Sequence, residues 1–131
     1  MSRAHFLEPL LRSGAGTFAL RNRRSGLSIA TIVETAFDSS TRRRGLLGRD
    51  SLPAGHALII APSSSVHTFG MRFPIDVLFV SRSGLVLKTR RELRPRRIAG
   101  RIGAFAVIEL AAGQIDAADT RVGDIIETIP R

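Results

Sequence analysis

The segment that decides the fold reads His67-Thr68-Phe69-Gly70-Met71-Arg72-Phe73-Pro74-Ile75-Asp76-Val77-Leu78-Phe79-Val80, and it joins polar side chains to the most apolar strand predicted in the chain. Pro74 fixes its own φ and disfavours a helical conformation at Phe73, so the chain should enter a strand at Ile75. Side chains alternate between the two faces of a strand, and residues 75–80 are apolar on both faces except for Asp76. We therefore expect a buried strand with one carboxylate at its start.

Length and hydropathy favour an ordinary globular protein. The 131 residues suffice for one domain with one core, and 44% of them are apolar. No apolar run approaches the roughly 20 residues that a membrane-spanning helix needs. Glu8 and Pro9 interrupt the amino-terminal apolar residues, so this end does not resemble a secretory signal peptide. We expect a soluble, cytoplasmic protein.

The chain has no cysteine, which excludes disulfides, thiolate nucleophiles and cysteine-ligated metal centres. Its formal net charge of +9 raises nucleic acid or an anionic surface as a partner. Arginine supplies nearly all of this charge, however, and codon bias alone can produce such a skew. The charge by itself therefore does not identify a partner.

Short apolar runs separated by turn residues predict a mostly β, marginally α+β domain: a compact antiparallel β-sandwich or small barrel with one short helix packed on it. Residues 1–16 are expected to form a tail or capping segment, and 17–131 a single β-rich domain. Residues 38–41 offer several possible N-caps for the helix, which should run to about Leu47 and end at Gly48. The predicted strands cover residues 17–20, 27–35, 57–61, 75–80, 85–89, 104–110 and 125–129.

Five blocks in this order resemble a known family: Arg42–Arg49, Ala57–Ile60, Met71–Val80, Val107–Gly113 and Val122–Asp124. Together they resemble the domain of unknown function 192 family over roughly residues 27 to 129. No single block is specific, but five in sequence make coincidence a poor explanation. The resemblance implies a compact, mostly β bacterial or archaeal domain whose biochemical role is not established.

Two carboxylates in apolar strands, Asp76 and Glu109, are the main candidates for chemistry. If they share one pocket, burial and mutual repulsion would separate their pKa values and suit them to general acid–base catalysis. The structural alternative is that an arginine or backbone N–H groups neutralise each of them. His67 is a further candidate base, but it lacks a second histidine at metal spacing, so no metal or other cofactor is predicted.

We expect these groups to rim a pocket for a small polar ligand, with arginines nearby that could bind an anion or close over Asp76. A scaffold role is the other interpretation of such a domain, and a different class of function is a hydrolase-like enzyme that uses both carboxylates. The predicted pocket residues are His67, Thr68, Met71, Arg72, Asp76 and Glu109, with Arg42 and Arg49 nearby.

The segment from Arg82 to Arg101 holds eight basic residues and one acid, a local balance of 8 − 1 = +7. It is a candidate phosphate-binding surface for nucleic acid, although it has no aromatic residues for base stacking. A solvated basic loop is the alternative, and the oligomeric state is open. The candidate contacts are Arg90, Arg91, Arg94, Arg96, Arg97 and Arg101.

Overall fold

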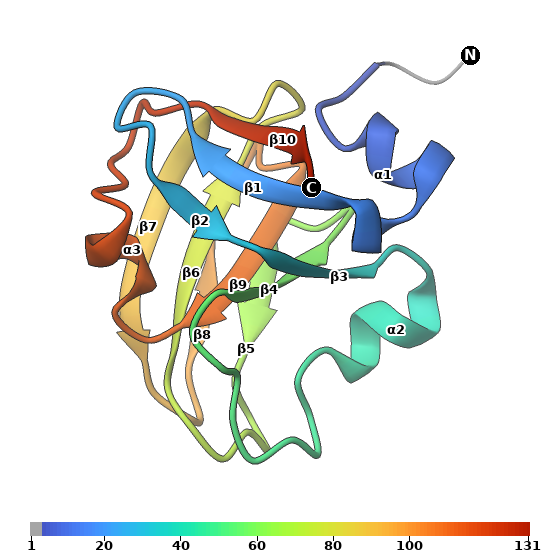
Figure 1. Cartoon of the computed structure of the whole chain (residues 1–131). Helices are drawn as coiled ribbons and strands as arrows, with labels where there is room; N and C mark the ends of the chain where they lie inside the picture. Colours follow the sequence, from blue (N-terminus) through green and yellow to red (C-terminus); the bar gives the residue numbers. More distant parts are fainter. Residues whose placement is uncertain (1–3) are drawn as a thin grey trace.

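The computed structural model describes residues 4–131 and contains three sheets with short helices around them (Figure 1). The helices are α1 (Glu8–Ser13), α2 (Ser39–Arg44) and α3 (Gln114–Ala117), with one 3-10 turn at Ala15–Thr17. The strands are β1 (Phe18–Asn22), β2 (Ser28–Ala30), β3 (Ile32–Ala36), β4 (His56–Ile60), β5 (Ser65–His67), β6 (Ile75–Val80), β7 (Val86–Leu93), β8 (Ile98–Gly100), β9 (Ala106–Ala111) and β10 (Ile126–Pro130).

A five-stranded sheet in the order β3-β4-β9-β6-β7 forms the centre of the molecule. Every residue of β6 is buried, as its two apolar faces require. Strand β6 pairs antiparallel with β7 on one side and β9 on the other, and only β3 and β4 are parallel. The 75–80 strand and its hairpin with the following strand are thus confirmed.

The first face of this sheet is covered by the three-stranded sheet β10-β1-β2, which Figure 1 shows crossing in front of it. Helices α1 and α3 complete this core: Leu7 precedes α1, and Leu10 and Ile115 are the buried residues within the two helices. The core also takes Leu78 and Leu110 from the central sheet. The amino-terminal segment therefore packs as part of the body from residue 7 onward.

The second face is covered by α2 and by a two-stranded ribbon, β5-β8. Val77 and Phe79 of β6 and Val107 of β9 face this side, where they meet Leu46 after α2 and Val66 of β5. The central sheet thus separates two apolar cores, one on each face.

The mostly β prediction is confirmed, with differences in detail. The three sheets do not form a closed barrel over residues 4–131, and three short helices are present where one was expected. Residues 27–35 form two strands in different sheets, because the chain leaves β2 after Ala30 and re-enters at β3. The ribbon strands β5 and β8 are three residues each and carry too little alternation to be predicted.

Helix α2 begins where its N-cap predicts and ends earlier than expected. The Asp38 carboxylate accepts a hydrogen bond of 2.8 Å from the Thr41 backbone N–H. Gly45 then adopts φ +48°, which stops the helix before the predicted end at Gly48. This early end places Gly45 over the central sheet.

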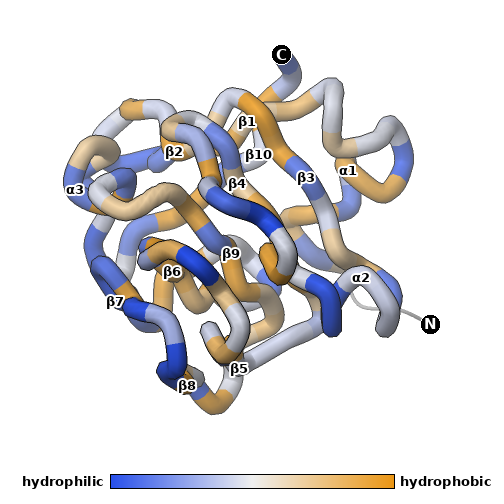
Figure 2. The backbone as a smooth tube through the Cα atoms, turned by 90° about the horizontal axis from the view of Figure 1, so that it is seen from below, coloured by the Kyte–Doolittle hydropathy of each residue, from blue (hydrophilic) through white to orange (hydrophobic). Residues whose placement is uncertain are grey.

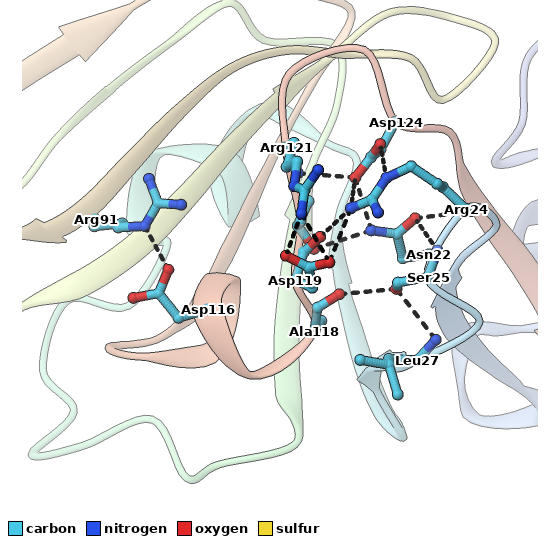
Figure 3. Close-up of polar contacts among 11 residues, drawn as sticks. Asn22, Arg24, Ser25, Leu27, Arg91, Asp116, Ala118, Asp119, Arg121 and Asp124 are labelled. Carbon is cyan, nitrogen blue, oxygen red and sulfur yellow. Dashed lines mark hydrogen bonds and ion pairs between the residues drawn. The ribbon is translucent and has the colours of Figure 1, made fainter.

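A polar cluster ties the β1–β2 turn to the segment before β10 (Figure 3). The buried Asp124 carboxylate accepts hydrogen bonds from Arg24 Nε at 2.7 Å and Asn22 Nδ2 at 2.9 Å. The same carboxylate accepts a bond of 2.8 Å from the Arg121 backbone N–H. These donors, led by Arg24, lower the pKa of Asp124 from 3.8 to about 2.

Candidate functional site

The register of the central sheet places Glu109 on the second face. Glu109 of β9 lies opposite Leu58 of β4 and Val77 of β6, and Leu58 in turn lies beside Glu34 of β3. Directly paired residues point to the same side of a sheet. Two carboxylates, Glu34 and Glu109, therefore flank Leu58 on the face that α2 covers.

Glu109 is buried without full hydrogen bonding. Its residue is 2% exposed, and its Oε2 atom has no hydrogen-bond partner among the described residues. Burial raises its pKa from 4.5 to about 7, against the nearby charge of Arg49, which lowers the value. A buried polar atom left unpaired costs on the order of 1–3 kcal/mol, so this carboxyl is a destabilising feature that the fold retains.

Oε2 belongs to a side chain that lines a cavity of about 130 Å³ between the end of α2, the β5 segment and the central sheet. We call it the Glu109 cavity. Gly45 forms part of its wall, and a Cβ added there would lie 3.9 Å from Glu109 Oε1. The lining residues are Arg42, Arg43, Arg44, Gly45, Leu46, Leu47, Ile60, Ser63, Ser65, Val66, His67, Met71 and Glu109.

The arginines around the cavity differ in their hydrogen bonds. Arg42 Nη1 donates to the Phe37 carbonyl at 2.8 Å, and Arg43 Nε donates to the Ser39 carbonyl at 3.4 Å.

Arg49 makes two bonds to Glu34, at 2.8 and 3.1 Å, and does not line the cavity. Arg44 is exposed, lines the cavity and makes no side-chain hydrogen bond to any residue in 4–131. Arg44 is therefore the arginine whose donors remain available to a ligand.

Asp76 points to the other face of the sheet. It lies opposite Leu110, and its carboxylate accepts backbone hydrogen bonds from Glu92 at 2.9 Å, Gly113 at 3.1 Å and Ile115 at 2.9 Å. Two of these donors, Glu92 and Gly113, have positive φ values of 49° and 94°. The expectation that Asp76 and Glu109 share a pocket is not met, because adjacent positions in paired strands face opposite sides.

Two more of the predicted pocket residues have structural contacts instead. Thr68 is buried, donates to the Arg94 carbonyl at 2.6 Å and accepts from the Arg97 N–H at 2.8 Å, which ties the loop before β6 to the loop before β8. Arg72 makes an exposed ion pair of 2.6 Å with Asp50. Of the predicted residues, the structure thus brings together Arg42, His67, Met71 and Glu109, but not Arg49, Thr68, Arg72 or Asp76.

Several cavity residues were missed or underrated from the sequence. Ser63 and Ser65 lie outside the predicted strands, and their place in the lining depends on the ribbon that β5 forms with β8. Gly45 lies within the predicted helix, but in the structure it ends the helix and lies near Glu109. Only knowledge of the strand pairing could have found these positions.

The arginine-rich segment runs along β7 and into β8, and Figure 2 shows hydrophilic colouring along β7. Arg91 pairs with Asp116 at 2.7 Å. Within residues 4–131, no carboxylate pairs with Arg94, Arg96, Arg97 or Arg101, and all four are exposed. Ile98 among them is 70% exposed.

Among residues 4–131, no group of three or more histidine, aspartate or glutamate side chains is placed to hold a metal ion. No helix in that range has both the length and the apolar character required to cross a membrane. A cytoplasmic location stays a prediction.

Two solved structures share this fold. One is described as a "putative transcription regulator" from Sinorhizobium meliloti 1021; it matches with a TM-score of 0.74 and 24% identity over 85% of this chain and 91% of that one. The other is a protein of unknown function from Novosphingobium aromaticivorans DSM 12444, with a TM-score of 0.70 and 21% identity over 85% of this chain and 83% of that one.

Among curated proteins, none matches the sequence significantly. A family model does match, over residues 20–128, and its description is DUF192, Uncharacterized ACR. The matched range spans β1 to β10 and includes the whole lining of the Glu109 cavity. The chain therefore belongs to the domain of unknown function 192 family, a family of uncharacterised proteins.

Proposed function

We propose that this protein binds a small polar molecule in the Glu109 cavity. The observation that carries the proposal is the buried Oε2 of Glu109, which lacks a hydrogen-bond partner and belongs to a side chain lining an open cavity. A ligand group that bonds to this oxygen would remove the cost of leaving it unpaired. Buried groups of this kind mark functional sites more often than exposed ones.

The size and lining of the cavity support a small ligand. Its volume of about 130 Å³ is close to that of a protein cavity known to hold one benzene-sized molecule, about 150 Å³. Leu46, Ile60 and Met71 supply an apolar wall, while serine, histidine and arginine side chains supply polar groups. A mostly apolar wall with a few convergent polar groups is the usual composition of a ligand site.

Binding is favoured over two-carboxylate hydrolysis. Such hydrolysis, as in glycosidases, needs a second carboxyl group about 5–10 Å away, so that the two flank the bond to be cleaved. Asp76 faces the opposite core, and Glu34 is held by Arg49 outside the lining. Among the described residues, Glu109 is the only carboxylate that lines the cavity.

A crystallographic fragment soak tests the proposal, using a library of polar fragments with about five to eight heavy atoms. We expect fragments to collect beside Glu109 Oε2. In Glu109→Leu, which keeps similar bulk but removes both oxygens, that cluster should disappear. A water bonded to Oε2 in every soak, with fragments bound elsewhere, would contradict the proposal.

A second candidate function is nucleic-acid binding by the exposed arginines of the β7–β8 segment. The observation in its favour is that Arg94, Arg96, Arg97 and Arg101 have no carboxylate partner within residues 4–131. One structural neighbour is described as a "putative transcription regulator". Binding through phosphate contacts weakens as the salt concentration rises. The affinity for a labelled DNA duplex, measured by fluorescence anisotropy, should therefore fall steeply with increasing salt concentration. A flat slope would reject this function.

A further inference from the structure

The charge of the Glu109 cavity identifies one class of ligand. Its lining includes Arg42, Arg43 and Arg44, the imidazole of His67, and a single carboxyl group. A concave site with an excess of one sign of charge raises the local concentration of ions of the opposite sign. The lining therefore contains three arginine residues and one acidic residue, a balance that favours an anion over a cation.

Arg44 is the group best placed to hold that anion. Arg42 and Arg43 each use a donor on a backbone carbonyl of their own segment. The Arg44 guanidinium makes no side-chain hydrogen bond within the described residues, and a guanidinium has five N–H donors in a planar fork. That fork matches the two oxygens of a carboxylate or phosphate.

Glu109 supplies the second contact in its neutral form. An ionised Glu109 would repel an anionic ligand, whereas a protonated carboxyl has one O–H to donate to a ligand oxygen. Its burial among apolar residues favours the protonated form. Anion binding and proton uptake at Glu109 should therefore be coupled.

We propose that the ligand of the Glu109 cavity is a small oxyanion, a carboxylate or a phosphate, whose charge is bound by Arg44 and one of whose oxygens accepts a hydrogen bond from neutral Glu109. This inference rests on the proposed function and names its ligand class. The volume of the cavity restricts the anion to a few heavy atoms beyond its charged group.

Titrations followed by amide NMR spectra test the inference at constant ionic strength. The probes are glycolate, inorganic phosphate, uncharged ethylene glycol and cationic ethanolamine. Glycolate or phosphate should shift the amide signals of Gly45, Leu46, Ser65 and His67. Whichever of the two anions binds more tightly shows whether the site prefers a carboxylate or a phosphate. Ethylene glycol and ethanolamine should bind at least about tenfold more weakly, because they lack the charge-assisted bond to Arg44.

Variants separate the two contacts. Arg44→Gln should weaken glycolate or phosphate binding by about tenfold or more, whereas Arg12→Gln, the same charge change at an exposed site on α1, should leave it unchanged. The carboxylate of glycolate stays ionised between about pH 6 and pH 8, but the imidazole of His67 also lines the cavity and histidine can change charge in this range. Glycolate binding that weakens at the higher pH in the wild type but not in Glu109→Gln therefore reports Glu109 and not His67. Glu109→Gln keeps a donor and should bind glycolate without this pH dependence.

The outcomes distinguish this inference from the proposed function. If ethylene glycol or ethanolamine shifts the cavity amides as strongly as the anions, and Arg44→Gln behaves like Arg12→Gln, the oxyanion inference is wrong while the binding site stands. If no probe shifts the cavity amides and the anions shift only exposed arginine segments, both are wrong.

Discussion

Asp76 and Glu109 lie on neighbouring strands, with Asp76 opposite Leu110 and Glu109 opposite Val77, and their carboxylates point to opposite faces of the central sheet. Asp76 accepts three backbone hydrogen bonds, whereas Glu109 Oε2 accepts none. Two carboxylates on neighbouring strands therefore affect stability in opposite directions: the hydrogen bonds of Asp76 stabilise the fold, and the unpaired oxygen of Glu109 destabilises it. One carboxylate fixes the fold, and the other is buried with an oxygen that has no partner among the described residues.

Asp76→Ala should lower the free energy of unfolding by about 2 kcal/mol or more, because it leaves three backbone donors without their acceptor. One of the donors belongs to Glu92, a non-glycine residue with a φ of 49°, and its bond to Asp76 helps to hold this strained backbone in place. Urea unfolding followed by circular dichroism measures the change. Asp50→Ala is the control, since the Asp50 side chain is 87% exposed and its ion pair should contribute at most about 1 kcal/mol. Equal midpoints for the two variants would contradict the role of Asp76.

Glu109 should make stability fall as pH rises. Its pKa is about 7 in the folded protein and near 4.5 in the unfolded chain, so between these values the folded state binds more protons. The stabilisation from the protonated form is complete below about pH 4.5 and is lost as pH rises through about 7. The difference amounts to at most about 3 kcal/mol, by the conversion of roughly 1.4 kcal/mol per pKa step.

Glu109→Gln measures this contribution, because glutamine does not titrate. The variant should be more stable than the wild type at about pH 8 and should lack the downward slope between about pH 4.5 and 7. Urea midpoints across that range test it. A wild-type curve that runs parallel to that of Glu109→Gln would show that Glu109 is ionised throughout.

The sequence predicted which side chains share a face within a strand, but not which faces meet. Strand 75–80 was located correctly, and the alternation that groups Glu109 with Val107 agrees with the structure. Glu109 pairs with Val77 and not with Asp76, so the two carboxylates point to opposite faces of the sheet. A shift of one residue in register would reverse this result, and a single sequence does not encode register in any local pattern.

Gly84→Ala should destabilise the protein by more than its backbone strain alone. Gly84 has φ +84°, and a Cβ there would overlap the carbonyl oxygen of Ile126 and lie 3.3 Å from the Phe6 ring. Gly48→Ala is a matched control, because Gly48 has the same φ of +84° and no neighbouring atom within 4 Å of an added Cβ. The control should cost about 1 kcal/mol, and Gly84→Ala at least about 1 kcal/mol more. If urea unfolding shows that both variants lose the same unfolding free energy, β10 can move away from the added Cβ at no cost in stability.

Asp124 should stabilise the protein at neutral pH and lose this effect in acid. Arg24 and Asn22 lower its folded pKa from 3.8 to about 2, so the contribution is complete above about pH 4 and disappears as pH falls through about 2. Asp124→Asn should therefore be less stable than the wild type at pH 7 by about 1–3 kcal/mol, the usual cost of losing a charged hydrogen-bond acceptor. The two should converge in acid; a constant difference down to about pH 2 would assign the loss to packing.

Arg49 should hold the pKa of Glu109 below the value that burial alone would give. Arg49 is fixed by its two bonds to Glu34, which lies on the far side of Leu58 from Glu109, and its charge is the one identified influence that lowers the Glu109 pKa. Arg49→Gln removes that charge, so the Glu109 pKa should rise above about 7. The side-chain carboxyl carbon shift of Glu109, followed by NMR against pH, reports the change directly. Arg72→Gln removes an equal charge from an exposed pair with Asp50 and should leave the titration where it was. If both variants titrate like the wild type, Arg49 acts only on Glu34, and the ionisation of Glu109 is set by burial alone.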